Sequence, residues 1–230
     1  MSRRDRNPDT LFAAALEGDR SALARLLSMI EQGGDDARTV GRLSYPLGGH
    51  SYTVGLTGAP GAGKSTLTSS IIGHLRKMDL EVAVLAIDPS SPFTGGAILG
   101  DRVRMQDHAT DRGVFIRSMA TRGHLGGLSL AAPEAIRLLD AIGRLWVLVE
   151  TVGVGQVEVE IAGKADTTVV VLNPGAGDEV QAVKAGLLEI ADIFAINKAD
   201  RDGVESTRRD LHAMLELTED FAPVNAHHCP

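Results

Sequence analysis

The sequence predicts an α/β fold, with a mostly parallel sheet flanked by helices on both faces and a short N-terminal helical extension. Two observations lead to this prediction. Short apolar runs typical of buried strands alternate with stretches of helical periodicity along most of the chain, which implies right-handed βαβ crossovers. In addition, 43% of the 230 residues are hydrophobic, which is enough to fill one sizeable core. Ligand chemistry in such a fold belongs at the carboxyl ends of the strands.

The individual elements follow from the same patterns. Thr10–Ile30 is apolar at helical spacing but interrupted at Gly18-Asp19, so it predicts two short helices, and the Gly-, Asp- and Arg-rich Gln32–Gly49 predicts a connector. Strands are expected at Tyr52–Thr57, Glu81–Ile87, Val114–Ser118, Leu145–Val149, Thr167–Leu172 and Ile193–Ile196. Helices are expected at Ser65–Met78, Asp101–Ala109, Ala131–Ile142 and Val180–Ile190. Residues 1–48 are therefore assigned to the extension and connector, and residues 49–230 to the main domain.

Composition restricts the possible partners and location. The net charge of −7 argues against a sequence-independent nucleic-acid binder, which would show a basic face. The single cysteine, Cys229, excludes an intrachain disulfide, and no apolar run has the length of a membrane span. The charged N-terminus lacks the apolar core of a secretory signal. We expect a cytoplasmic protein that binds neither nucleic acid nor membrane.

A phosphate-binding loop is the most informative motif. The stretch after the first predicted strand fits G-x-x-x-x-G-K-[ST], and its backbone N–H groups would face phosphates while the lysine reaches the β/γ oxygens and the serine hydroxyl holds Mg²⁺. The expected binding residues are Gly58, Ala59, Pro60, Gly61, Ala62, Gly63, Lys64, Ser65 and Thr66. A Gly-rich turn that binds nothing is the alternative, and both flanking elements argue against it.

A second loop predicts which base is bound. Asn197-Lys198-Ala199-Asp200 follows the last predicted strand and so lies at the same edge of the sheet. An ionised Asp200 only accepts hydrogen bonds, which suits the two neighbouring N–H donors of guanine, whereas adenine presents an acceptor on the matching ring nitrogen. These residues therefore favour GTP or GDP, and a merely polar loop is the alternative.

Three acidic residues at strand ends or just beyond predict a magnesium site. Asp88 follows the second strand, Asp101 follows a Gly-rich loop, and Glu150 ends a buried strand. Mg²⁺ prefers oxygen ligands but usually takes only one or two carboxylates beside phosphates, so not all three need touch the metal. Asp101 could instead cap a helix, whereas Glu150 at the end of a buried strand needs a partner.

The loop after Glu150 lies where the nucleotide-sensing loop of a triphosphatase would follow its second acidic strand. An N–H of Gly153 could contact the γ-phosphate, and hydrolysis would then release the loop. Gln156 could orient the attacking water. Lys64, Asp88, Gly153 and Gln156 are thus the expected catalytic residues, and an ordinary flexible loop is the alternative reading of the last two.

These motifs together closely resemble the MeaB/ArgK family of SIMIBI-class P-loop GTPases, which act as chaperones of adenosylcobalamin-dependent methylmalonyl-CoA mutase. The resemblance covers about residues 10 to 220. It includes G-A-P-G-A-G-K-S-T at 58–66, D-P-S-S-P-F-T-G-G-A-I-L-G-D-R-V-R-M at 88–105, E-T-V-G-V-G-Q at 150–156, P-G-A-G-D-E-V-Q-A-V-K-A-G at 174–186 and N-K-A-D at 197–200.

The resemblance implies a P-loop GTPase that assembles the mutase, loads its cofactor and protects it from inactivation. It implies that Asp88, Asp101 and Glu150 cluster around Mg²⁺. It also implies that the segment from Gly175 to Lys184 is a switch carrying nucleotide state to the mutase, with roles for Asp178, Gln181 and Lys184.

Two departures from the family pattern are visible. The segment that leads into the strand before Glu150 usually has a Gly-aromatic-Asp pattern in the family. This chain has Ile142-Gly143-Arg144-Leu145-Trp146 there instead, which could disturb sheet packing. The chain also ends at Pro230, whereas family members continue through a last strand, a further guanine-side loop and a C-terminal dimerisation arm. The resemblance therefore implies a truncated member of a family of homodimers. We expect lowered stability or aggregation because a sheet edge would be left uncovered.

Other functions remain as alternatives. One is a GTP-binding adaptor that hydrolyses poorly because of the truncation. The older family label of lysine/arginine/ornithine transport kinase is another, although no amino-acid-binding motif supports it. Nickel delivery is disfavoured because no His- or Cys-rich tract precedes the phosphate loop.

Overall fold

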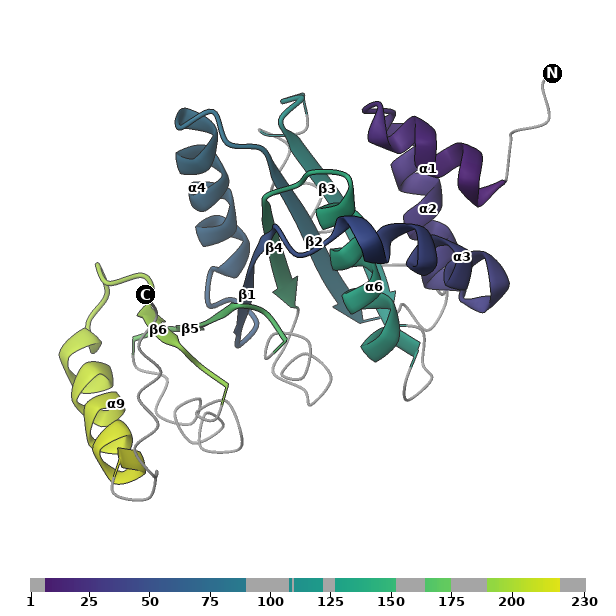
Figure 1. Ribbon diagram of the computed structural model, residues 1–230. Coiled ribbons are helices and arrows are strands. Elements are labelled where there is room, and N and C mark those ends of the chain that lie inside the picture. The colour runs from purple at the N-terminus through teal and green to yellow at the C-terminus, as the bar shows by residue number, and fades with distance from the viewer. Residues whose placement is uncertain are drawn as a thin grey trace.

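A computed structural model describes residues 7–89, 108, 110–121, 127–151, 164–174 and 190–219 (Figure 1). The helices are α1 (Pro8–Leu16), α2 (Arg20–Gln32), α3 (Gly34–Ser44), the 3₁₀ turn η1 (Tyr45–Leu47), α4 (Lys64–Lys77), α6 (Gly127–Ala141) and α9 (Val204–Glu219). The strands are β1 (Tyr52–Gly58), β2 (Val82–Pro89), β3 (Val114–Thr121), β4 (Trp146–Thr151), β5 (Thr167–Leu172) and β6 (Ile193–Ile196). The α/β class and the six expected strands are confirmed, with small shifts at the strand ends.

The strands form one parallel sheet in the order β3-β2-β4-β1-β5-β6. β1 lies between β4 and β5, with Tyr52 opposite Trp146 and Val54 opposite Thr167. Because every strand runs the same way, the segments that follow β1, β4 and β6 leave from one edge. This topology brings the expected phosphate, metal and guanine residues to the same edge of the sheet.

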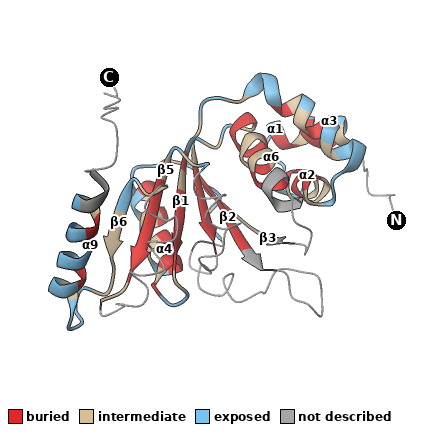
Figure 2. Ribbon diagram, turned by 90° about the horizontal axis from the view of Figure 1, so that it is seen from below, coloured by how far each residue is buried: buried red, intermediate tan, exposed pale blue. Residues whose placement is uncertain are grey.

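Helices cover both faces of the sheet (Figures 1 and 2). On one face, α1, α2, α3 and α6 share a core with alternate residues of β2 and β4, such as Leu85 and Val147. On the other face, α4 packs through Ile72 and Leu75 on Leu56 and its neighbours. The expectation of a sheet flanked on both faces is therefore confirmed, and the N-terminal helices share the core of the sheet.

The N-terminal helices begin where the sequence supplies caps. The side chain of Asn7 accepts the backbone N–H of Asp9, and that of Asp19 accepts the N–H of Ser21 at 2.7 Å. Residues 34–44, expected to be part of a connector, instead form α3. Asp35 and Asp36 lie in its first turn, where negative charge interacts favourably with the positive end of the helix dipole. Val40 of α3 is buried against the shared core.

Two arginines fasten these helices to the edge strand β3. Arg20 donates to the carbonyl oxygens of Asp111, Arg112 and Val114. Arg117 of β3 reaches across to Glu31 of α2, at 2.5 Å between Nη2 and Oε2. Since both side chains of the second pair are largely shielded from water, the pair is screened less than a surface salt bridge.

The sequence departure before β4 leaves the sheet intact. β4 pairs with both β1 and β2 from Trp146 onward, and the ring of Trp146 lies 5.4 Å from that of Tyr52. Arg144 is folded inward beside Glu81. Burial lowers the pKa of this arginine, and the nearby charge of Arg20 lowers it further.

The remaining expectations have mixed outcomes. α9 was not predicted; Leu211 and Met214 of this helix pack on Val170 and Leu172 of β5, next to β6. The helices expected at 101–109 and 180–190 fall almost wholly outside the described residues. In the described part of the chain, no helix is long and apolar enough to cross a membrane.

Candidate functional site

The loop between β1 and α4 forms the centre of the site, and two of its glycines make close contacts with neighbouring segments. Gly58 has φ +139°, and a Cβ atom there would lie 2.2 Å from the carbonyl oxygen of Val171 on β5. Gly63 has φ +96°, and a Cβ atom there would lie 2.2 Å from Nδ2 of Asn197. Both positions have a positive φ that favours glycine. At Gly58 the neighbour is backbone and leaves no room for a side chain, whereas at Gly63 a side chain would displace the amide of Asn197. The loop thus fits against β5 and the segment after β6.

Lys64 begins α4 and turns back over this loop. Its side chain is only 6% exposed, and Nζ donates to the carbonyl oxygens of Gly58, at 2.7 Å, and Ala59, at 3.0 Å. These bonds hold the ammonium group within the loop itself. A phosphate bound by the loop would therefore meet a positive charge that is already in position.

Ser65 and Glu150 bring two oxygen donors together. Glu150 is the next-to-last residue of β4, lies opposite Leu56 of β1 and is 2% exposed. Its Oε1 accepts a hydrogen bond from the Ser65 hydroxyl at 2.5 Å. A hydroxyl and a carboxylate next to a phosphate-binding loop are the oxygen ligands that Mg²⁺ prefers, so these two residues fit a magnesium site.

The side chains of the other two expected metal ligands, Asp88 and Asp101, are not among the parts of the chain that the structure describes. Asp88 is the next-to-last residue of β2, two positions beyond Ala86, which pairs with Glu150. Among the residues that the structure describes, no group of three or more His, Cys, Asp or Glu could hold a metal ion.

The loop after β6 contacts the phosphate loop directly. Nδ2 of Asn197 donates to the carbonyl oxygen of Ala62 at 2.8 Å, and Nζ of Lys198 donates to that of Gly61 at 2.6 Å. Lys198 has φ +54°, an uncommon left-handed conformation for a lysine. Asp200 lies exposed just beyond. Sequence reasoning assigned this loop to the base and missed that two of its side chains support the phosphate loop.

Two further polar atoms near the site were not singled out from the sequence. Oγ1 of Thr57, directly before Gly58, and Oδ1 of Asn173, directly after β5, are buried. Neither atom has a hydrogen-bond partner among the described residues. Buried polar groups are normally paired, so both are candidates for contact with a ligand or water. No sequence pattern marked them, because their burial depends on the strand order.

Several expected residues cannot be placed. Gly153 and Gln156 of the loop after β4 lie outside the described residues, as do Asp178, Gln181 and Lys184 of the expected switch. The described site consists of the phosphate loop, the Ser65–Glu150 pair and the loop from Asn197 to Asp200.

Comparison with known proteins shows which family the chain belongs to. The family profile "Methylmalonyl Co-A mutase-associated GTPase MeaB" matches residues 23–227. A protein of Pyrococcus abyssi named as a GTPase is 58% identical over 92% of the chain, which spans 65% of that relative's length. The GTPase ArgK of Escherichia coli is 43% identical over 81% of the chain, which spans 57% of its length.

A solved structure has a similar fold. The crystal structure of a LAO/AO transport system kinase superposes with a TM-score of 0.72 at 28% sequence identity, covering 99% of this chain and 68% of that one. The resemblance drawn from the sequence motifs is confirmed. The chain belongs to the methylmalonyl-CoA mutase-associated GTPase (MeaB) family.

Proposed function

We propose that this chain is a Mg²⁺-dependent GTPase that serves as a chaperone of methylmalonyl-CoA mutase, in assembly, cofactor loading and protection. The observation that carries the proposal is the contact of Ser65 with Glu150 beside the buried Lys64. A cation, a hydroxyl and a carboxylate meet there at the start of α4, where backbone N–H groups also favour anions. Family membership and the names of the relatives support the activity and the partner.

The described residues have distinct roles in this proposal. The phosphate loop, from Gly58 to Thr66, binds the phosphates through backbone N–H groups, and Lys64 neutralises charge that develops on the β/γ oxygens. Asn197 and Lys198 hold the loop in shape through their bonds to its carbonyl oxygens. Asp200 accepts the two N–H groups of guanine.

Ser65 and Glu150 would hold Mg²⁺, with Asp88 and Asp101 as further ligands. When bound there, the ion would supply positive charge next to the phosphate oxygens. Gly153 and Gln156 are proposed to contact the γ-phosphate and to orient water. Asp178, Gln181 and Lys184 are proposed to pass the nucleotide state to the mutase.

Phosphate release from GTP tests the catalytic part of the proposal. Lys64→Ala should abolish measurable turnover, because the developing charge loses its buried cation. Lys77→Ala, an exposed lysine at the end of the same helix, is the matched control and should keep full turnover. Turnover by Lys64→Ala equal to that of the wild type would show that the site is assigned wrongly.

Addition of a methylmalonyl-CoA mutase tests the coupling. The proposed chaperone should release phosphate faster when the mutase is present. Tight GTP binding without turnover, alone or with the mutase, would support the adaptor function instead. Asp200→Ala should reduce the preference for GTP over ATP, and an unchanged preference would exclude Asp200 as the guanine contact.

A further inference from the structure

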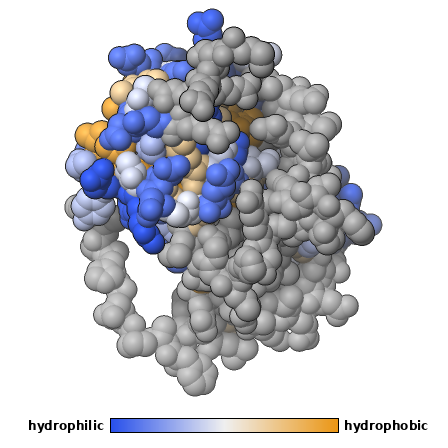
Figure 3. All heavy atoms as spheres, turned by 90° about the vertical axis from the view of Figure 1, so that its right-hand side faces the viewer, coloured by the Kyte–Doolittle hydropathy of each residue, from blue (hydrophilic) through white to orange (hydrophobic). Residues whose placement is uncertain are grey.

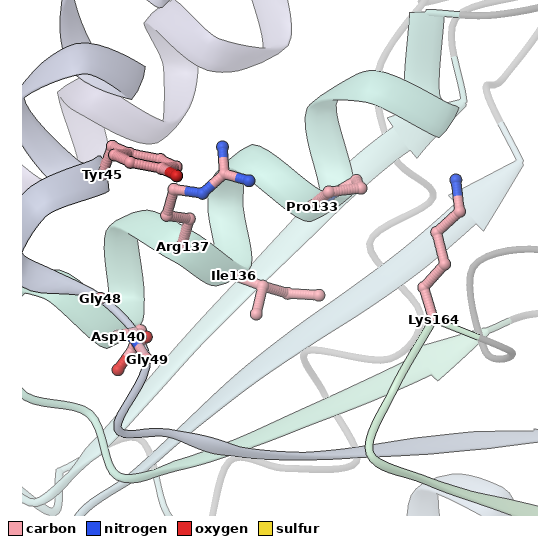
Figure 4. Close-up of a pocket in the computed structure, with 8 residues that line it drawn as sticks. All are labelled: Tyr45, Gly48, Gly49, Pro133, Ile136, Arg137, Asp140 and Lys164. Atoms are coloured by element: carbon pink, nitrogen blue, oxygen red, sulfur yellow. Dashed lines mark hydrogen bonds between the residues drawn. The ribbon is translucent and has the colours of Figure 1, made fainter.

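The described surface away from the phosphate loop favours no particular ligand. Figure 4 shows Tyr45 and Arg137 on one side of a hollow of about 510 Å³ and Lys164 on the other. Asp140 also lines this hollow, so its charges are of both signs. Figure 3 shows that the side of the molecule with α1–α3 is largely hydrophilic among the coloured residues, with separate small apolar spots. A buried hydroxyl group directly before the phosphate loop is chemically more informative.

This hydroxyl group belongs to Thr57, which precedes Gly58 on the central strand β1. The side chain is 0% exposed, and Oγ1 has no hydrogen-bond partner among the described residues. Val170 lies opposite on β5, and a valine at position 57 would have nearly the same shape as the threonine. A buried hydroxyl group without a partner destabilises a folded protein, and valine does not carry this cost. The hydroxyl of Thr57 therefore needs an explanation other than packing.

A second buried threonine lies beside Thr57, on β4. Leu56 pairs with Glu150, so the next residues of these two parallel strands, Thr57 and Thr151, are also neighbours. Both side chains lie on the face of the sheet away from α4, because Leu56 packs on α4 and successive side chains of a strand alternate between the faces.

The hydroxyl of Thr151 has only a weak bond. The residue is 0% exposed, and its Oγ1 donates to the carbonyl oxygen of Leu56 at 3.4 Å, which is long for a hydroxyl donor. Adjacent strands are about 4.8 Å apart, so rotation about χ1 can bring the two threonine hydroxyl groups within hydrogen-bonding distance. Such threonine pairs on one face of a sheet stabilise it.

The two threonines lie next to the two halves of the nucleotide site. The carbonyl oxygen of Gly58, directly after Thr57, accepts a hydrogen bond from Lys64. Glu150, directly before Thr151, accepts one from Ser65. Phosphate at Lys64 and Mg²⁺ at Glu150 would therefore act on the backbone next to each threonine. The fit of β4 against β1 at this point then depends on whether the site is filled.

We propose that Thr57 is a positioning residue of the nucleotide site, and that its hydroxyl pairs with that of Thr151 when Mg²⁺ and GTP are bound. This inference rests on the proposed function. The bond ties the start of the phosphate loop to the strand end that carries Glu150, so the phosphate-binding and metal-binding groups keep a fixed separation. Because the hydroxyl is a cost in the free protein and a contact in the bound one, its removal affects the two states in opposite directions.

Thr57→Val tests the proposal, because it removes the hydroxyl and keeps the shape. The urea midpoint of the nucleotide-free protein should rise, since an unpaired buried group is lost. Affinity for Mg·GTP, measured by titration calorimetry, should fall about three- to tenfold, the range of one hydrogen bond. Thr57→Ser keeps a hydroxyl and should restore the wild-type affinity. Thr53→Val is the matched control, because Thr53 is 5% exposed on the same face of β1 at its other end, and it should leave the affinity unchanged.

Thr151 and the metal provide further readouts. Thr151→Val should weaken Mg·GTP binding to a similar extent, and the double variant should bind no more weakly than either single one, because the same bond is lost once. The loss in Thr57→Val should shrink when GTP binding is measured in EDTA, since Glu150 then holds no ion.

The outcomes separate this inference from the proposed function. If the wild type binds Mg·GTP and Thr57→Val binds it equally tightly, the positioning role is wrong while the proposed function stands. A lower affinity together with a lower urea midpoint would show that Thr57 acts through packing, and would overturn the role as well. If the wild type binds no GTP, the proposed function is wrong and the role of Thr57 is overturned with it.

Discussion

The contact between Gly63 and Asn197 predicts that two mutations in distant motifs are energetically coupled. In Asn197→Ala the bond from Nδ2 to the carbonyl oxygen of Ala62 is lost, which costs about 1 kcal/mol. In Gly63→Ala the new Cβ atom would lie 2.2 Å from Nδ2, so the amide must move and the same bond is lost. The left-handed backbone at residue 63 adds about 1–2 kcal/mol of strain.

The double variant loses this bond only once. Its cost should therefore fall short of the sum of the single variants by about 1 kcal/mol, well above the scatter of about 0.3–0.5 kcal/mol expected for independent sites. Gly143→Ala is the matched control, since Gly143 has φ +86° and open space around its Cβ position. It reports the backbone cost alone, including the effect of alanine on the unfolded chain.

Urea unfolding of the nucleotide-free protein at 25 °C in EDTA measures all four variants. The coupling should appear as a difference in midpoint without a change in slope. Costs that add within the scatter would refute the reasoning, because they would mean that Gly63→Ala leaves the bond from Asn197 to Ala62 intact. A Gly63→Ala cost equal to that of Gly143→Ala would refute it equally.

Three further predictions follow from single contacts. Gly58→Ala should cost about 2–4 kcal/mol in urea unfolding, since its Cβ atom would meet the carbonyl of Val171; a cost no larger than that of an unhindered glycine would contradict this. Asp140→Ala should cost about 2 kcal/mol, because this carboxylate accepts three backbone N–H groups of the turn before β1, and an unchanged midpoint would contradict it. The pKa of Asp111 is lowered by hydrogen bonds from Arg76 and a backbone N–H, so its contribution to stability should be full at neutral pH, begin to fall below the ordinary aspartate pKa and be lost as the pH falls through the lowered pKa of the folded state. Arg76→Ala should raise this pKa in an NMR titration, and an unmoved titration would exclude the arginine as its cause.

Most of the sheet could be predicted from the sequence because its inner strands, such as β4 and β5, are buried along almost their whole length. Runs such as Thr167–Leu172 are continuous, β-branched and bounded by polar residues, and β5 has these bounds in the structure. α3 and α9 could not be predicted in the same way. Val40 is one of only two buried residues of α3, so this helix depends on packing against α2 and α6 more than on its own apolar pattern.

The parts of the site that could be predicted are the residues placed at the carboxyl ends of predicted strands, or just after them. Ser65 lies in the first turn of the helix after β1, and Glu150 lies near the carboxyl end of the neighbouring strand β4, and the structure places them in contact. The bonds from Asn197 and Lys198 to the phosphate loop were not predictable. They depend on β5 and β6 being the next strands beyond β1 and on the left-handed conformation of Lys198, and neither property can be read from a four-residue motif.

The position of β1 between β4 and β5 also sets the order in which the protein can form as it is synthesised. Tyr52 pairs with Trp146, so the strand that carries the phosphate loop leaves the ribosome about ninety residues before its first partner. At about 5–20 residues per second, β1 waits roughly 5–20 s with both edges unpaired. β2 and β3 are close in sequence and can pair early, but the gap between β2 and β1 closes only when β4 inserts. The nucleotide site is therefore among the last parts of the protein to become complete, and the newborn chain exposes the edges of its central strand until then.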